Sequence, residues 1–425
     1  MTHEIPAANM NCIAIRANQK SPEAARLTQT SEATTGIIDM TRLHRRQALR
    51  LIAGATGATL ATPAIIRAQT PSELKIGGML PLSGPAAIEG HQVLKGLEFA
   101  VKEANAAGGA LDREIVLMVE DDEANTTRGV IAVRKLIETD KVPFIVGTYA
   151  SAVVIATMQI TKEYGVPLLS GGSTSVAATD ANEPGNPWFF RSWPSSVDQG
   201  LDTANAITGR FGAKTVAIIH DSGSYGYSLG DQVEQVVKDN GGEILSRDTY
   251  NAGEQDFTTL LTRIRSEKPD AVYIGGWAGD GAMIVRQATE VGLRTQFVGS
   301  GSMVSDDFIE LAGPASEGFA VATLYEPSTP NVYGAEFGKR FEAEVGQAAG
   351  TLNSLGFDST SIGIEAVRRT GGTDSKAVRD MIATGMADFP IVQGPEGATA
   401  AFDAKGSVDF PNFIAVIKDG VRTLA

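Results

Sequence analysis

The sequence is poor in the residue types that build thiol and imidazole chemistry. Its 425 residues include one cysteine, Cys12, and four histidines, and aromatic residues make up 6% of the chain. Cys12 lies in an N-terminal segment that we expect to be removed, so the remaining chain has no thiol for a disulfide or a thiolate metal site. His91 and His220 are its two remaining histidines, too few for a histidine-based metal site. Since the sequence also lacks phosphate-binding and dinucleotide-binding motifs, we expect neither metal nor cofactor.

Positive charge is also scarce once the N-terminal segment is set aside. Beyond residue 68 the chain has 28 Lys and Arg against 46 Asp and Glu, a formal charge of −18. Such an acidic surface repels phosphate backbones and anionic lipid headgroups. We therefore expect no nucleic-acid partner and no direct binding to a membrane surface. The hydrophobic content of 43% is typical of a globular protein.

The N-terminal segment resembles a twin-arginine export signal. Arg45 and Arg46 precede a mildly apolar stretch, 51–66, and Ala68 follows as a candidate cleavage residue. Residues 1–68 are thus a predicted presequence, of which 1–39 look like an over-extended start, and the mature chain is expected in the periplasm. Ala48 stands where such signals usually have Phe, which leaves the general secretion route open. A buried helix or a membrane anchor are further alternatives, although the 16-residue stretch is shorter than the ~20 apolar residues of a span.

From residue 74 onward, short apolar runs alternate with helical periodicity. This alternation predicts βα units and mostly parallel sheets, an α/β fold with two doubly wound lobes. Strands are predicted at 74–81, 114–120, 142–146 and 166–169, and then at 215–219, 243–249, 271–274, 296–298 and 318–322. Helices are predicted at 126–139, 152–164, 197–211, 225–240, 256–268 and 281–291. Residues 334–385 read as helices, and 400–402 with 413–417 as a closing pair of strands.

The length of the chain favours two lobes rather than one core. Helices without a sheet of their own must return to one already made, so the chain should cross between lobes three times, near 193–196, 323–326 and 393–397. The N-terminal lobe is then 72–194 plus 325–395. The C-terminal lobe is 195–324 plus 396–425.

An ordered set of short motifs resembles the leucine/isoleucine/valine-binding protein family. The set comprises Leu82-Ser83-Gly84-Pro85, Ala104 to Gly109, Glu120-Asp121-Asp122, Tyr164 to Pro167, His220-Asp221 with Tyr225-Gly226, and Gly253 to Phe257. The resemblance implies a type I periplasmic-binding fold with three crossovers and a cleft that closes on a solute. It also implies a monomeric, non-enzymatic component of an ABC importer that passes the solute to permease and ATPase subunits. Relatives often have a cysteine pair near the positions of Ala124 and Ala150, and this chain lacks it.

Small polar residues follow two predicted strands of the first lobe. Ser151 comes at the start of a predicted helix, where free N–H groups favour an anion. Gly172, Ser173 and Thr174 follow the strand 166–169 and let the backbone approach a ligand. By resemblance, these four residues match the family's carboxylate clamp. A helix cap for Ser151 and a plain turn for the Gly-rich segment are the structural alternatives.

Aromatic residues occupy the matching places of the second lobe. Tyr225 follows the strand 215–219 and Trp277 follows 271–274, at positions where the family places aromatic side chains against the ligand. For Trp277 the alternative is core filling, but the glycines on both sides favour a loop.

The charge partner of a ligand's ammonium is the main departure from the family. Relatives tend to offer a carboxylate after the strand 296–298, where this chain has Ser300, Gly301 and Ser302. An unpaired buried ammonium costs several kcal/mol. Either Glu89, Asp280 or Asp306 supplies the charge, or the ligand has no ammonium. Glu89 stands where relatives often carry an aromatic residue near the cleft mouth, and a solvated surface acid is its alternative.

Ligand binding is therefore the predicted function, with Ser151, Gly172, Ser173, Thr174, Tyr225, Trp277, Glu89 and Gly301 as site residues. The expected ligand is an amino acid of the branched-chain type or a related small carboxylate. An aromatic or aliphatic carboxylate, an amide, or a role as a periplasmic ligand sensor are alternatives. A serine hydrolase is a remote one, since residues 226–230 match G-x-S-x-G. That motif lacks its strand immediately before Ser228, and no histidine follows His220.

Overall fold

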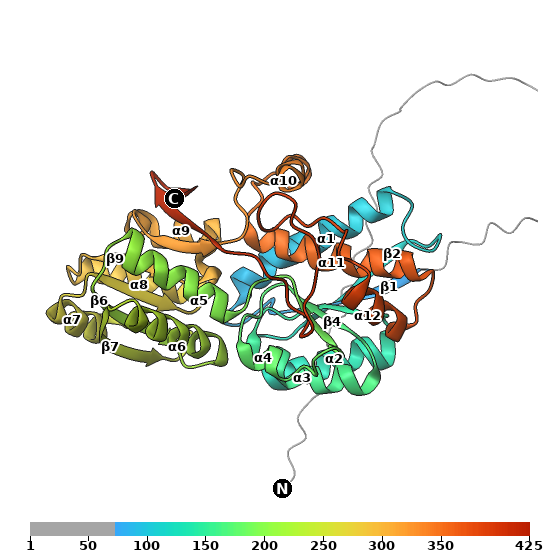
Figure 1. The fold of residues 1–425 in the computed structure, drawn as a ribbon, viewed down its shortest axis with the longest axis horizontal. Helices are drawn as coiled ribbons and strands as arrows, with labels where there is room; N and C mark the ends of the chain where they lie inside the picture. The colour runs from blue at the N-terminus through green and yellow to red at the C-terminus, as the bar shows by residue number, and fades with distance from the viewer. Residues whose placement is uncertain (1–72) are drawn as a thin grey trace, which may run out of the picture. The chain divides into compact units, whose positions relative to one another are not determined.

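The computed structural model describes residues 73–425, which form two α/β lobes with a separate sheet in each (Figure 1). The predicted presequence, with Cys12, the arginine pair and the cleavage residue Ala68, lies outside the described residues. Within 73–425, no helix combines the length and apolar character needed to cross a bilayer.

The first sheet has five parallel strands in the order β2-β1-β3-β4-β5. Its strands are β1 (Leu74–Leu80), β2 (Ile115–Asp121), β3 (Ile145–Gly147), β4 (Leu168–Ser170) and β5 (Phe189–Arg191). Its helices are α1 (Ala87–Ala106), α2 (Thr126–Arg134), α3 (Ser151–Tyr164), α4 (Val176–Asp180), α11 (Thr351–Thr370) and α12 (Ser375–Thr384). Figure 1 shows α1 and α11 on one side of this sheet and α2 and α3 on the other. The four predicted strands are found, and β5 is a fifth strand that the sequence did not predict.

The second sheet has seven strands in the order β12-β11-β10-β9-β8-β6-β7. Its strands are β6 (Thr215–Asp221), β7 (Glu243–Tyr250), β8 (Ala271–Gly275), β9 (Gln296–Gly299), β10 (Ala320–Thr323), β11 (Phe413–Lys418) and β12 (Val421–Leu424). The nearby helices are α5 (Ser196–Asn205), α6 (Ser224–Asp239), α7 (Thr258–Glu267), α8 (Ala278–Glu290) and α9 (Asp306–Ala312). β11 runs antiparallel to both β10 and β12. The predicted strand at 400–402 is wrong, and β12 is the true partner of β11.

Continuous apolar runs explain why the central strands form. All five residues of β8 are buried, as expected for a parallel strand covered on both faces. Two glycines set the closest helix contact of the first lobe. A Cβ at Gly96 would lie 2.0 Å from the carbonyl oxygen of Asn353, and one at Gly356 would lie 2.1 Å from that of Val93. α1 and α11 can therefore approach only because both positions are glycine.

The last return of the chain to the second sheet lies late in the sequence. Arg191 N in β5 donates to Gly406 O at 2.8 Å, and Val408 N donates to Arg191 O at 3.2 Å. β11 then begins at Phe413 in the second sheet. The segment 396–408, which the sequence assigned to the second lobe, therefore hydrogen-bonds beside the first sheet. We propose lobe boundaries with the return placed between 408 and 413 instead of near 393–397.

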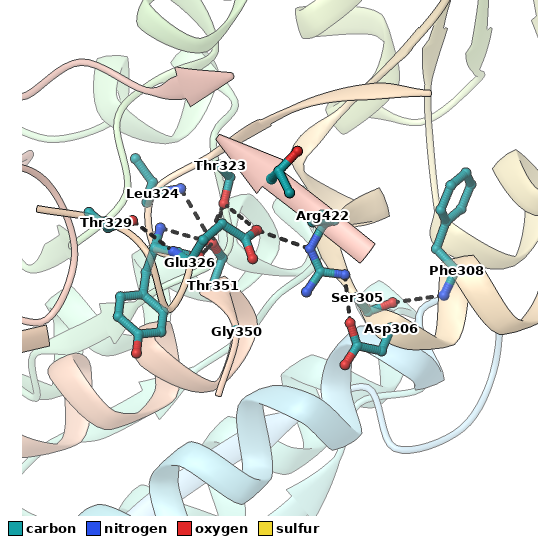
Figure 2. A network of polar contacts seen from close by, with 12 residues as sticks. Ser305, Asp306, Phe308, Thr323, Leu324, Glu326, Thr329, Gly350, Thr351 and Arg422 are labelled. Atoms are coloured by element: carbon teal, nitrogen blue, oxygen red, sulfur yellow. Dashed lines mark hydrogen bonds and ion pairs between the residues drawn. The ribbon is translucent and has the colours of Figure 1, made fainter. Parts of the chain in front are cut away.

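A buried ion pair holds the second crossover, where the chain leaves β10 for α10 (Val332–Val345) and α11 (Figure 2). Arg422 Nε, on β12, donates to Glu326 Oε1 at 3.0 Å, and its guanidinium also pairs with Asp306 at 2.8 Å. Thr323 Oγ1 donates to the same Glu326 oxygen at 3.1 Å. Burial raises the pKa of Glu326 above its usual range, and Arg422 opposes that shift. The charge of Glu326 thus depends on Arg422.

The start of α11 is tied to the same crossover. Thr351 Oγ1 accepts from Leu324 N at 3.3 Å and from Tyr325 N at 3.1 Å, and it donates to Tyr325 O at 2.8 Å. The backbone between β10 and α10 is therefore fixed by a side chain of the first lobe and by the ion pair from β12.

We predict that Arg422→Met lowers the free energy of unfolding by about 3–5 kcal/mol, because it leaves the Glu326 carboxylate buried without its cation. The double variant Arg422→Met/Glu326→Gln should recover most of that loss, since neither charge then remains. Urea unfolding measures both values. Lys376→Ala, which breaks an exposed ion pair with Asp380, is the control and should cost about 0–1 kcal/mol. A double variant no more stable than Arg422→Met would contradict the prediction.

Candidate functional site

Ser151 lies inside the first lobe as the first residue of α3, directly after the loop that follows β3. Its side chain is buried, and its hydroxyl accepts a hydrogen bond from Ser173 Oγ at 3.1 Å. The N-cap residue is Ala150, without a side-chain cap, so the helix-cap alternative for Ser151 is wrong. The two serine hydroxyls therefore meet at the N-terminal end of a 14-residue helix, where the helix dipole favours an anion.

The loop after β4 is held by its own first residue. Ser170 Oγ donates to Thr148 O at 2.6 Å and accepts from Gly172 N and Ser173 N at 3.4 and 3.2 Å. A Cβ at Gly172 would lie 2.1 Å from the ring of Tyr149, so glycine is required for that ring to pack there. A plain turn, the structural alternative for this segment, does not by itself require glycine at position 172. Thr174 is fully buried, and its hydroxyl has no hydrogen-bond partner among residues 73–425.

Aromatic rings from both lobes meet beside these loops. Trp277 and Tyr225 stack with ring centroids 5.0 Å apart and planes 25° apart, and Tyr149 lies 6.1 Å from Trp277 at 51°. Trp277 is the N-cap residue of α8 and Tyr225 the second residue of α6. The predicted loop position of Trp277 is thus the boundary between β8 and its helix, and the indole is buried there.

A serine of the second lobe links two of these rings. Ser302 Oγ donates to Tyr225 Oη at 3.0 Å and lies 3.2 Å from Tyr149 Oη. Tyr149 belongs to the first lobe, so this short chain of hydroxyls crosses from one lobe to the other. Ser302 follows Gly301, at which a Cβ would lie 2.3 Å from the Trp193 ring. Gly301 therefore allows the close packing of its loop, and its contact with a ligand stays a prediction.

Glu89 is fully buried, so its alternative as a solvated surface acid is wrong. It lies in the first turn of α1, and its Oε1 accepts a hydrogen bond from Ala278 N at 2.8 Å. Ala278 is the first residue of α8, so a carboxyl of one lobe meets a helix N-terminus of the other. The pKa of Glu89 is raised to about 7, mainly by burial. The hydrogen bond from Ala278 N opposes this shift.

The two other acids considered as charge partners differ in position. Asp280 is buried in the first turn of α8, and its Oδ1 accepts from Gly253 N at 3.1 Å. Burial raises its pKa to about 6. Asp306 is exposed and pairs with Arg422 at the crossover. The structure thus places Glu89 and Asp280 in the first turns of α1 and α8, whereas Asp306 pairs with Arg422 at the crossover.

Sequence reasoning missed Tyr149 and Ser302, which join the predicted residues into one cluster. Tyr149 stands two positions before Ser151, and Ser302 lies in the segment 300–302 that was noted only for lacking a carboxylate. A signal existed for each, since both lie directly after a predicted strand, where open α/β sheets place their ligands. Their mutual contact depends on the approach of two separate lobes, which sequence spacing does not encode.

The structure overturns the hydrolase alternative. The G-x-S-x-G segment lies within α6 instead of between a strand and a helix, and Ser228 Oγ lies 2.6 Å from Ser196 Oγ. His220 Nδ1 contacts the backbone oxygen of Asp221 at 2.8 Å, and its Nε2 accepts from Arg247 at 3.0 Å. His220 is therefore not placed to activate Ser228, and it forms no dyad with the Asp221 side chain.

Comparisons with known proteins agree with this arrangement. A family described as "Periplasmic binding protein" matches residues 73–421. The chain is 29% identical over 360 residues to Leu/Ile/Val-binding protein homolog 1 of Brucella suis biovar 1, covering 84% of this chain and 94% of the relative. It is 30% identical over 346 residues to homolog 2 of Brucella abortus, covering 81% and 90%. A leucine-binding protein from Thermotoga maritima superposes with a TM-score of 0.75 at 25% identity, covering 83% and 97%.

Buried acids of the second lobe predict a pH-dependent stability. Burial raises the pKa of Asp221 to about 7, well above its usual 3.8. The folded protein therefore binds more protons than the unfolded chain between these values, and the stability present at about pH 4 is lost as the pH rises through about 7. Asp221→Asn cannot ionise but still accepts the bond from Gly223 N. It should lose less stability than the wild type between pH 4.5 and 8, by on the order of 2 kcal/mol.

Urea unfolding of the ligand-free protein across this pH range measures the difference. Asp239→Asn, an exposed acid at the end of α6, is the matched control and should follow the wild-type profile. Parallel profiles for Asp221→Asn and the wild type would show that Asp221 is not the group that titrates.

Proposed function

The chain belongs to the Leu/Ile/Val-binding family of periplasmic binding proteins, and we propose that it is the solute-binding component of an ABC importer. Its ligand is an amino acid of the branched-chain type or a related small carboxylate. It acts as a monomer in the periplasm after export, and it delivers the solute to the permease and ATPase subunits. The related Brucella proteins named for Leu/Ile/Val binding and the leucine-binding protein of Thermotoga maritima support this ligand class.

The contact between polar loops of one lobe and aromatic rings of the other is the observation that carries the proposal. Ser151 and Ser173 place hydroxyls at the start of α3, and the buried hydroxyl of Thr174 lies in the loop after β4. A carboxylate held there receives hydroxyl and N–H donors together with the favourable end of the helix dipole. Two or three such charge-assisted bonds, each worth roughly 1.5–3 kcal/mol, are enough to orient it.

The aromatic cluster covers the apolar part of the ligand. Tyr225 and Trp277 come from the second lobe and Tyr149 from the first, so a solute between them contacts both lobes at once. Because each lobe alone presents half of these contacts, a solute stabilises the closed arrangement over any open one. The closed surface is then the state that a membrane partner recognises.

We predict that Ser151→Ala and Trp277→Ala each weaken binding of the cognate ligand by roughly 10-fold or more. The first removes a donor to the carboxylate and the second removes the largest apolar wall. A thermal-shift panel of branched and polar amino acids, benzoate-type acids, short dicarboxylates and amides identifies the ligand. Ligand at about 100 times its dissociation constant adds about 2.7 kcal/mol of stability, which such a panel detects.

Matched controls separate binding from folding. Ser266→Ala changes an exposed serine of α7, and Trp188→Ala changes an indole just before β5 that packs against the guanidinium of Arg379. Both should keep the wild-type affinity. Unchanged affinity in Ser151→Ala and in Trp277→Ala would refute the proposed site.

A further inference from the structure

We infer that Glu89 of α1 is the counter-ion that this chain provides for the protonated amine of its solute. The inference rests on the proposed function, because it assigns the ligand class of the same interlobe site. It also selects Glu89 from the three acids that the sequence left open for this charge, the other two being Asp280 and Asp306.

The first argument is the incomplete bonding of Glu89. Its Oε1 is satisfied by Ala278 N, but Oε2 is buried and has no partner in any other residue between 73 and 425. A buried carboxylate oxygen without a partner is costly, and each oxygen has two positions at which it accepts a hydrogen bond. An N–H group of a ligand is the kind of partner that fills this position.

The second argument is the sign of the charges around Glu89. The charged groups that act on it most strongly are Asp280 from α8 and Asp307 from α9, and both are acids. Tyr149, Tyr225 and Tyr250 also feel its charge, and burial raises the pKa of all three hydroxyls, so these groups stay neutral. The surroundings of Glu89 therefore consist of acids and neutral phenols on the elements packed against it, and a cation relieves the repulsion among the acids.

The third argument concerns the second lobe. Asp280 Oδ2 is also buried without a partner among residues 73–425, but Asp280 is bonded to Gly253 N within its own lobe. The loop after β9 offers hydroxyls only, and these are already used. Ser300 Oγ donates to Gly276 O at 2.8 Å and accepts from Gly276 N at 3.2 Å, while Ser302 bonds to Tyr225. A hydroxyl engaged in this way does not neutralise an ammonium. Glu89 is the unsatisfied acid that reaches the second lobe from the first.

The aromatic cluster is compatible with a cation at this place. Glu89 binds the residue next to Trp277, whose ring stacks on Tyr225 and lies beside Tyr149. The faces of Trp and Tyr attract a cation, with Trp the strongest of them. Tyr149 also packs against Gly172 of the loop after β4. A zwitterion thus meets hydroxyls and a helix N-terminus on the Gly172 side of this ring and the carboxylate of Glu89 near Trp277.

The test compares each amino acid with the acid that lacks only the amine, such as leucine with isocaproate and phenylalanine with hydrocinnamate. Isothermal calorimetry with the wild-type protein should detect binding of the amino acid and at least 10-fold weaker binding of its partner. Glu89→Gln keeps the acceptor for Ala278 N and loses the charge, so it should weaken the amino acid by roughly 10-fold or more. Asp239→Asn, an exposed acid at the end of α6 that does not act on Glu89, is the control and should bind as the wild type does.

The outcomes separate the inference from the proposed function. If the deaminated acid binds the wild type as tightly as the amino acid, or if Glu89→Gln leaves the affinity unchanged, the inference is overturned and the binding site stands. If no amino acid and no carboxylate of the panel binds the wild type, the proposed function itself fails. Ligand-free melting temperatures establish that each variant is folded.

A pH series gives a second readout that a merely structural role of Glu89 would not produce. With an amine bound, Glu89 is ionised in both the open and the closed protein, so affinity should stay flat between about pH 5.5 and 8. Without an amine, burial raises the pKa of Glu89 in the closed protein to about 7, so affinity should fall as the pH rises through this window. Asp280 and Asp221 bond within their own lobe and should contribute alike to both ligands. Equal pH profiles for both ligands would overturn the inference.

Discussion

The contact between the lobes must bury polar groups without leaving them unpaired, and the rest of the site follows from this constraint. Glu89 and Ala278 lie 189 positions apart in the sequence and meet through one hydrogen bond. Tyr149 and Ser302 meet in the same way. Each of these hydrogen bonds offsets part of the desolvation that closure costs. A polar interface of this kind closes firmly only when a further molecule completes its hydrogen bonds.

The parts that must not move are bonded differently. α1 and α11 pack backbone against backbone at Gly96 and Gly356, which leaves no room for sliding. At the crossover, Arg422 and Glu326 form an ion pair whose separation would leave two buried charges. Rigid lobes and a firmly held crossover restrict motion to the surfaces that carry the site residues. Binding energy gained at the site is then spent on closure rather than on internal rearrangement of a lobe.

Local patterns in the sequence were enough to predict most strands and the position of Ser151 at a helix start. These features depend on apolar runs and on the order of elements, which neighbouring residues determine. The burial of Glu89 was not predictable in this way, because an acid in the first turn of a helix is equally consistent with a solvated surface. Its burial comes from α8, an element of the other lobe. Two prediction errors, the missed strand β5 and the wrongly predicted strand at 400–402, have the same explanation. Whether each segment forms a strand depends on pairing with distant segments of the chain.

The opposite charges of an amino acid also suit the electrostatics of this chain as a whole. A protein body with a formal charge of −18 repels a simple carboxylate at long range, and the N-terminus of α3 with its hydroxyls attracts one only at close range. A zwitterion has no net charge, so it approaches without that penalty. Once it is bound, its amine offsets the field of Glu89 and Asp280, which otherwise opposes a second anion nearby. A binding site that combines a carboxylate clamp with a buried acid therefore suits a solute with both charges. A solute with the negative charge alone is repelled by the buried acid.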